Sequence, residues 1–127
     1  MTRYASLHQL GVFPLGGEES FSGPLGNICN SGIPYGATLK SYLPLLTQRA
    51  LPFLEEFTPE LLIVSAGYDA LASDELASVN LLPKDYFEIA KSIKERFGAV
   101  AMGLEGGYSI EDLPLAIEAT LRPYIES

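Results

Sequence analysis

The chain has very few of the residues that build metal cages, disulfides or phosphate-binding loops. Among its 127 residues, Cys29 is the single cysteine, His8 is the single histidine, and tryptophan is absent. One cysteine excludes an intrachain disulfide and a cysteine-based zinc cage, and one histidine excludes a cluster of histidine ligands. Neither glycine-rich pattern typical of nucleotide phosphate loops occurs. These absences limit the chemistry that the chain can perform alone.

Basic residues and long apolar runs are scarce as well. Eight Lys and Arg stand against sixteen Asp and Glu, which gives a formal net charge of −8, and no basic patch favours direct nucleic-acid binding. No apolar run approaches the ~18 residues of a membrane span, and the N-terminus has no signal-peptide core. With 47% hydrophobic residues the chain can form a core. We therefore expect a single domain over residues 1–127 in a soluble, cytoplasmic protein without membrane contact.

Apolar patterning predicts strands and helices in alternation. We expect a short strand over residues 3–8 and two buried strands over 60–66 and 99–104, because the latter two lack polar alternation. Helical spacing follows from Leu39 to Phe57, where Pro44 fits the first turn and Pro52 should kink or end the regular helix. Pro83 opens a second helix, and Ser109 caps the first turn before a third. This alternation indicates an α/β fold with parallel strands.

Residues 11–36 hold seven of the twelve glycines and three prolines, which predicts a long loop. Loops of this length in compact domains are usually functional. Three parallel strands make a thin sheet, and parallel strands need both faces covered. We therefore expect this chain to form part of a larger sheet.

Two short segments with reactive side chains follow the predicted strands. Asp69 lies in Ser65–Ala70, directly after one apolar run, and Tyr108 ends the Glu-Gly-Gly-Tyr segment after the other. Ligands in open α/β sheets bind beyond the carboxyl ends of the strands. An aspartate there can bind a metal, and a tyrosine can hydrogen-bond developing negative charge. Read alone, Asp69 after Gly67 is more typical of a turn or helix-cap residue, and Tyr108 is more typical of a tyrosine that packs beside a glycine turn.

Five segments, in order along most of the chain, resemble the histone deacetylase family and its bacterial acetylpolyamine and acetoin-utilisation relatives. They are Ala5-Ser6-Leu7-His8-Gln9, Val12-Phe13-Pro14 with Gly16-Gly17, the stretch from Gly26 to Gly36, Phe57-Thr58-Pro59-Glu60 with Ser65-Ala66-Gly67-Tyr68-Asp69-Ala70, and Leu104-Glu105-Gly106-Gly107-Tyr108. The resemblance implies the three-layer parallel-sheet arginase/deacetylase fold. It also implies hydrolysis of an N-acetyl amide, on acetyl-lysine or an acetylpolyamine.

The resemblance assigns roles to individual residues. Asp69 matches one of the two aspartates that hold zinc with a histidine, and Tyr108 matches the tyrosine that hydrogen-bonds the substrate carbonyl and then the oxyanion. Ser6 and the Leu7 carbonyl match contacts of a monovalent cation, usually potassium. The substrate tunnel is assigned to Phe13, Leu76, Gly106 and Gly107.

The other zinc ligands and the catalytic histidine pair of the family lie upstream of the segment that begins this chain. His8 matches a histidine that is not a metal ligand, and we expect it to be half-buried and hydrogen-bonded, with Cys29 a small buried residue. Leu71 and Glu75 depart from the family pattern beside Asp69. We therefore expect the C-terminal part of a zinc-dependent deacetylase, incomplete for catalysis alone and associating with itself or with an N-terminal partner.

Two other interpretations remain open on the sequence. The first is a truncated remnant that folds or oligomerises without hydrolysing anything. The second is a small-molecule-binding α/β module that uses the loop over residues 11–36.

Overall fold

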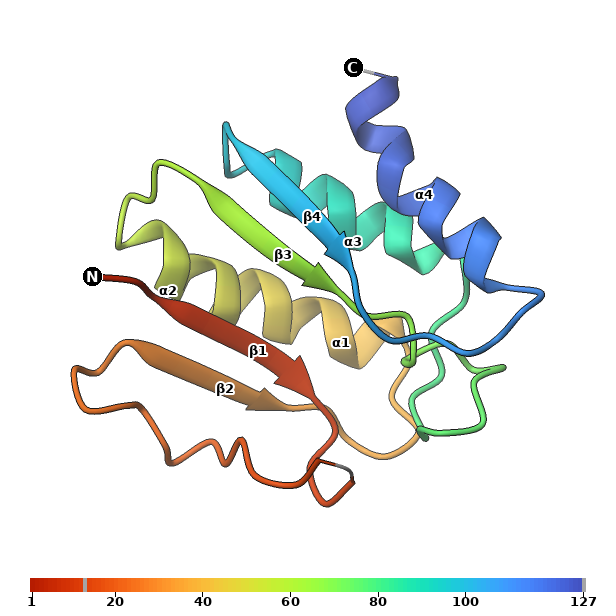
Figure 1. The fold of residues 1–127 in the computed structure, drawn as a ribbon, viewed down its shortest axis with the longest axis horizontal. Coiled ribbons are helices and arrows are strands. Elements are labelled where there is room, and N and C mark those ends of the chain that lie inside the picture. The colour runs from red at the N-terminus through yellow and green to blue at the C-terminus, as the bar shows by residue number, and fades with distance from the viewer. Residues whose placement is uncertain (13, 127) are drawn as a thin grey trace.

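A computed structural model describes residues 1–12 and 14–126, and its four strands lie against a layer of helices (Figure 1). The strands all run in the same direction, as the alternating pattern predicts. Their bounds, with those of the helices, are β1 Tyr4–His8, β2 Ile28–Gly32, α1 Leu39–Leu45, η1 Leu46–Ala50, α2 Leu51–Glu55, β3 Leu62–Ala66, α3 Asp85–Lys94, β4 Val100–Leu104 and α4 Leu113–Ile125.

The strands form two parallel pairs. β1 pairs with β2, and β3 pairs with β4 in a register that sets Ala66 opposite Leu104. The prediction of three strands was wrong, because β2 lies inside the region expected to be a loop. The sequence of β2, Ile-Cys-Asn-Ser-Gly, carries no apolar run, so its strand character depends on pairing with β1 rather than on its own composition.

The helices cover one face of the strands and leave the other uncovered in this chain (Figure 1). Leu62, Val64 and Val100 pack against the apolar cluster formed by η1, α2 and α3. The side chains between them point the other way, and Ile63 is 71% exposed. The expectation of fully buried strands over 60–66 and 99–104 is therefore wrong for this chain. Their apolar character on both faces is nevertheless typical of a parallel sheet with helices on both sides.

The first helical region is one continuous run whose geometry changes midway. The sequence predicts Pro44 in the first turn of a helix, but Pro44 lies beyond the first turn of α1, so this prediction was wrong. A five-residue π-helical segment, η1, precedes α2. Pro52 sits in the first turn of α2 and has no N–H to donate to the carbonyl four residues earlier. The wider π-helical turns just before it accommodate that missing hydrogen bond. The helix continues through Pro52 to Glu55, so Pro52 does not end it, and the predicted kink stays a prediction.

The last two helices pack closely on each other. Lys94 at the end of α3 donates to the carbonyl of Pro123 in α4 at 2.5 Å. Pro83 precedes α3 rather than opening it, and the hydroxyl of Ser109 accepts from the N–H of Asp112 in the turn before α4. No helix within residues 1–12 and 14–126 is long and apolar enough to span a bilayer.

Candidate functional site

The loops that carry Asp69 and Tyr108 start side by side. Beyond the end of the β3–β4 ladder, Glu105 donates its N–H to the carbonyl of Ala66 at 3.0 Å, and Tyr68 donates to the carbonyl of Gly106 at 2.8 Å. Strand pairing therefore continues into both loops. It brings two residues that are 39 positions apart in the sequence to the same edge of the sheet.

Asp69 and Tyr108 converge around Gly106. A Cβ atom built on Gly106 would lie 3.7 Å from the carboxylate carbon of Asp69 and 3.7 Å from the ring of Tyr108. Both side chains are exposed, and Tyr108 retains 62% of its accessible surface. The structure thus places a carboxylate and a phenol beside one small, open residue at the carboxyl ends of two parallel strands, where α/β sheets bind ligands.

Three tyrosines pack beneath this edge. The hydroxyl of Tyr68 donates to Thr120 at 2.9 Å, and its ring lies 4.7 Å from that of Tyr86. Burial, and the charge of Asp69 nearby, raise the pKa of Tyr42 to about 12, and burial raises the pKa of Tyr86 even more. The raised pKa values keep Tyr42 and Tyr86 protonated well above neutral pH, and the hydroxyl of Tyr86 donates to the carbonyl of Gly67 at 3.4 Å.

Two residues that the sequence reasoning did not single out join the loops. The buried carboxylate of Asp74 accepts the backbone N–H of Tyr108 at 2.9 Å, and the hydroxyl of Ser73 donates to Asp112 at 2.6 Å. Asp74 also accepts the N–H of Leu76, two residues on. That local turn is readable from an Asp in a Ser-Asp-Glu segment, whereas the bond to Tyr108 is not.

The predicted tunnel residues are only partly brought together. Gly106 and Gly107 form the loop between β4 and Tyr108, and the side chain of Leu76 is 68% exposed in the loop after β3. Phe13 lies outside the residues that the structure describes. The tunnel assignment stays a prediction.

The residues assigned to a monovalent cation lie at the end of β1. The hydroxyl of Ser6 and Nδ1 of His8 are hydrogen-bonded at 2.8 Å, and Leu7 packs against both apolar clusters of the core. Nε2 of His8 bonds the carbonyl of Gly17 at 2.8 Å, so the expectation of a hydrogen-bonded, half-buried histidine is confirmed. Cys29 is half-buried rather than buried. The cation site stays a prediction.

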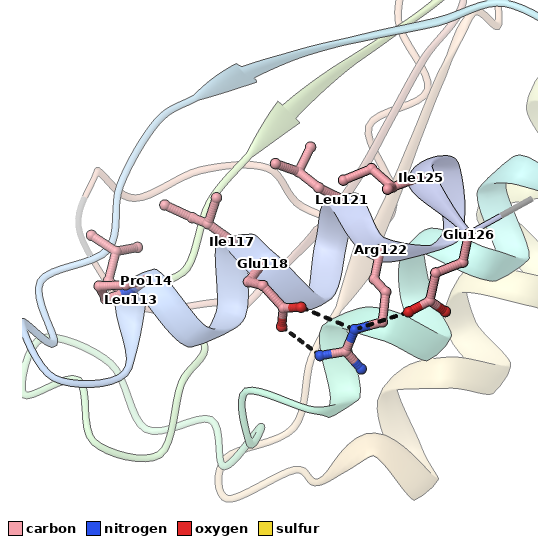
Figure 2. Close-up of a pocket in the computed structure, with 8 residues that line it drawn as sticks. All are labelled: Leu113, Pro114, Ile117, Glu118, Leu121, Arg122, Ile125 and Glu126. Carbon is pink, nitrogen blue, oxygen red and sulfur yellow. Dashed lines mark hydrogen bonds and ion pairs between the residues drawn. The ribbon is translucent and has the colours of Figure 1, made fainter.

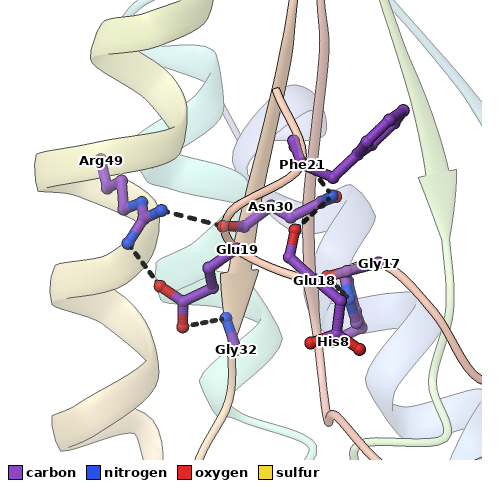
Figure 3. A network of polar contacts seen from close by, with 8 residues as sticks. All are labelled: His8, Gly17, Glu18, Glu19, Phe21, Asn30, Gly32 and Arg49. Atoms are coloured by element: carbon purple, nitrogen blue, oxygen red, sulfur yellow. Dashed lines mark hydrogen bonds and ion pairs between the residues drawn. The ribbon is translucent and has the colours of Figure 1, made fainter. Parts of the chain in front are cut away.

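Polar contacts fix the long loop between β1 and β2 (Figure 3). Asn30 donates to the carbonyls of Glu18 and Phe21, and Glu19 accepts from the N–H of Gly32. Arg49 of η1 donates to Glu19 at 2.8 Å, and the hydrogen bonds from the Gly32 N–H and from Arg49 lower the pKa of the Glu19 carboxyl. The loop is thus fastened by its own backbone and by one helix.

The described residues do not make a zinc site by themselves. Nowhere within residues 1–12 and 14–126 do three His, Cys, Asp or Glu side chains gather as a metal would require. Catalytic zinc sites use three protein ligands, and Asp69 provides one carboxylate. The residues present therefore fit one position of such a site and not the whole of it.

An apolar groove lies on α4 (Figure 2), and neither Asp69 nor Tyr108 lines it. Its volume is about 550 Å³. Figure 2 shows Ile117, Leu121 and Ile125 leaving α4 on one side, while the ion-paired Glu118 and Arg122 lie on the other. A helix with an unpartnered apolar row of this kind is suited to packing against further protein.

Known proteins resemble this chain in sequence and in fold. The family model for the histone deacetylase domain matches residues 2–123. An uncharacterized protein of Synechocystis is 38% identical over 122 residues, which cover 96% of this chain and 40% of that protein.

Two solved structures superimpose on nearly the whole chain. The HD domain of HDA15 matches with a TM-score of 0.92 and 25% identity, over 98% of this chain and 37% of its own. Acetylpolyamine aminohydrolase from Burkholderia pseudomallei matches with a TM-score of 0.87 and 25% identity, over 96% of this chain and 37% of its own. The chain thus has the α/β fold of deacetylases and spans less than half the length of these relatives.

Proposed function

Because the chain belongs to the histone deacetylase family, we propose that it forms part of a hydrolytic site that removes acetyl groups from amines, either acetyl-lysine or an acetylpolyamine. The observation that carries this proposal is the convergence of Asp69 and Tyr108 around Gly106. Two loops from adjacent strands present a carboxylate and a phenol, the pair that the resemblance assigns to metal binding and carbonyl polarisation.

In this proposal Tyr108 acts on the substrate directly. Its hydroxyl donates a hydrogen bond to the acetyl carbonyl, and the bond strengthens as negative charge develops on that oxygen. A donor in such a position typically contributes about 2.7–4 kcal/mol to the barrier reduction. The exposure of Tyr108 supports this role, because the phenol is not engaged in the core.

Asp69 contributes one ligand to a zinc site whose other ligands come from outside this chain. The family implies zinc, which would polarise the amide carbonyl and activate water. The proton-transferring histidine must also come from elsewhere, because both ring nitrogens of His8 are engaged with Ser6 and Gly17. The proposed unit of function is therefore these residues together with the rest of a deacetylase domain.

The uncovered faces of this chain support the need for further protein. Leu61, Ile63 and Leu104 are exposed on or beside the strands, and the α4 groove is lined by apolar side chains. Exposed apolar surface of this extent marks an interaction site. We propose that the remaining part of a deacetylase domain, in a longer chain or in a second polypeptide, covers these faces.

The test is reconstitution with measured metal content. This chain is mixed with the part of the Synechocystis relative outside the matched region, and the purified complex is examined for zinc by elemental analysis and for acetate release. We expect about one zinc per complex with wild type, and we expect Asp69→Ala to lose both the zinc and the acetate release. Glu111→Ala, which removes an exposed carboxylate from the turn before α4, is the matched control. A stable complex that binds no zinc and releases no acetate contradicts the proposal.

A non-catalytic role is the second candidate. The lack of three gathered ligands within residues 1–12 and 14–126, together with the uncovered apolar faces, favours a chain that self-associates without hydrolysing amides. In that case the chain forms oligomers and shows no affinity for the complementary fragment.

A further inference from the structure

Asp74 is a buried carboxylate with two backbone partners in different loops. Asp74 is 4% exposed. Oδ1 accepts the N–H of Leu76 at 2.8 Å, and Oδ2 accepts the N–H of Tyr108 at 2.9 Å. Hydrogen bonds to an ionised carboxylate are about twice as strong as neutral ones. One side chain thus joins the loop after β3 to the loop after β4.

The residue beside Asp74 reinforces the same connection. The hydroxyl of Ser73 donates to Asp112, so the hydroxyl of Ser109 must donate to Ser73, 2.7 Å away, because each hydroxyl has one hydrogen. Ser109 in turn accepts the N–H of Asp112. These bonds hold the segment that follows Tyr108, while Asp74 holds Tyr108 itself.

Tyr108 needs such a fixed point because it does not belong to either apolar cluster of the core. Its side chain is largely exposed, and it follows two glycines, of which Gly107 has a φ of +135°. Glycine gives the backbone a wide conformational range, so the segment has little stiffness of its own. The hydrogen bond from the Tyr108 N–H to Asp74 is therefore the contact that fixes the backbone position from which the phenol extends.

We propose that Asp74 is the positioning residue for Tyr108, an inference that rests on the function proposed for Tyr108. Asp74 does not touch substrate; its carboxylate fixes the backbone from which the phenol reaches the acetyl carbonyl. A carboxylate is required because both oxygens accept N–H donors. Asparagine would keep one acceptor and turn an NH₂ group toward the other N–H.

Amide hydrogen exchange of this chain, measured by NMR, tests the proposal without metal or substrate. We expect Asp74→Asn to raise the exchange rate of the Tyr108 amide at least about tenfold relative to that of Ala119 in α4. The matched control is Asp85→Asn, because Asp85 is 8% exposed and its Oδ2 accepts the N–H of Leu82 at 2.8 Å. The control should leave the ratio of Tyr108 to Ala119 unchanged.

An unchanged ratio in Asp74→Asn, or an equal rise in Asp85→Asn, overturns the proposal. If Asp74→Asn does not fold, wild type decides: the Tyr108 amide must exchange more slowly than that of Ile110, an exposed residue in the following turn. An unprotected Tyr108 amide in wild type also overturns it.

In the reconstituted complex, Asp74→Asn should lower kcat at least about tenfold with little change in KM, in the same direction as the loss expected for Tyr108→Phe, while Asp85→Asn should retain activity. Equal kcat for Asp74→Asn and wild type overturns positioning. An inactive, zinc-free wild-type complex instead contradicts the proposed function and leaves the exchange result to be judged separately.

Discussion

Gly107 lies directly against Tyr68: a Cβ atom built on Gly107 would be 2.7 Å from the Cβ of Tyr68, closer than real side-chain carbons approach. The φ of Gly107 is +135°, in a region that other residues rarely adopt. A Cβ atom built on Gly106, one position earlier, would make ordinary van der Waals contact at 3.7 Å with Asp69 and Tyr108. The two glycines before Tyr108 therefore differ: Gly107 is required by its backbone conformation and a close contact, whereas Gly106 has room for a methyl group.

Substitution of the two glycines separates these roles. Gly107→Ala should lower the free energy of unfolding by about 1–3 kcal/mol, because it combines a strained φ with a clash against buried Tyr68. Gly106→Ala should change it by less than ~1 kcal/mol while placing a methyl between Asp69 and Tyr108. Urea unfolding followed by circular dichroism measures both, and comparable losses for the two variants contradict the assignment.

The hydroxyl of Tyr68 should contribute to the stability of the fold, whereas the hydroxyl of Tyr108 should contribute to activity. Tyr68→Phe removes a buried hydrogen bond to Thr120 and should destabilise the fold by about 1 kcal/mol. Tyr108→Phe changes an exposed side chain and should leave stability within ~0.5 kcal/mol. In the reconstituted complex, loss of this donor should lower kcat by about 10²–10³. Retained activity in Tyr108→Phe would remove the proposed role.

Alkaline pH should destabilise the chain through Tyr42. Its pKa is about 12 in the fold against an ordinary value of 10, so the folded state holds a proton that the unfolded chain releases. This contribution is complete below pH 10 and is lost as the pH rises towards 12. Between pH 10 and pH 12, the free energy of unfolding should fall by about 1–2 kcal/mol less in Tyr42→Phe than in wild type. Urea titrations at the two pH values measure this difference. Tyr35→Phe, at an exposed tyrosine, is the control and should follow wild type.

The uncovered strand face should make the isolated chain associate. We expect light scattering at high concentration to give a mass above the 13.7 kDa of one chain. Ile63→Ser removes an apolar side chain from that face and should lower the mass, whereas Leu15→Ser, an exposed leucine in the β1–β2 loop, should not. A wild-type chain that stays monomeric contradicts the association that the sequence predicts.

The sequence predicts the parallel α/β fold well because its apolar strands and amphipathic helices leave clear apolar patterns. The sequence does not predict β2, because Ile-Cys-Asn-Ser-Gly forms a strand through its pairing with β1. It does not predict the exposure of Ile63 either, because an apolar strand has the same composition whether or not a second layer covers it.

The site could be predicted for its two reactive residues and not for their support. Asp69 and Tyr108 each follow a strand, so their meeting at one sheet edge follows from parallel pairing. Asp74 and Ser73 reach across 34 and 39 positions by hydrogen bonds that depend on the final path of two loops. No periodicity or local motif encodes such a distance.

The contacts of Arg49 constrain the order in which the chain can acquire its structure during synthesis. The loop between β1 and β2 is fastened partly by Arg49, which bonds Glu19 and the carbonyl of Asn30. A chain emerging from the ribosome reaches Asn30 well before Arg49 exists outside the exit tunnel. The contacts that Arg49 makes with this loop can therefore form only after η1 has been synthesised, whereas the pairing of β1 with β2 uses residues that are made earlier.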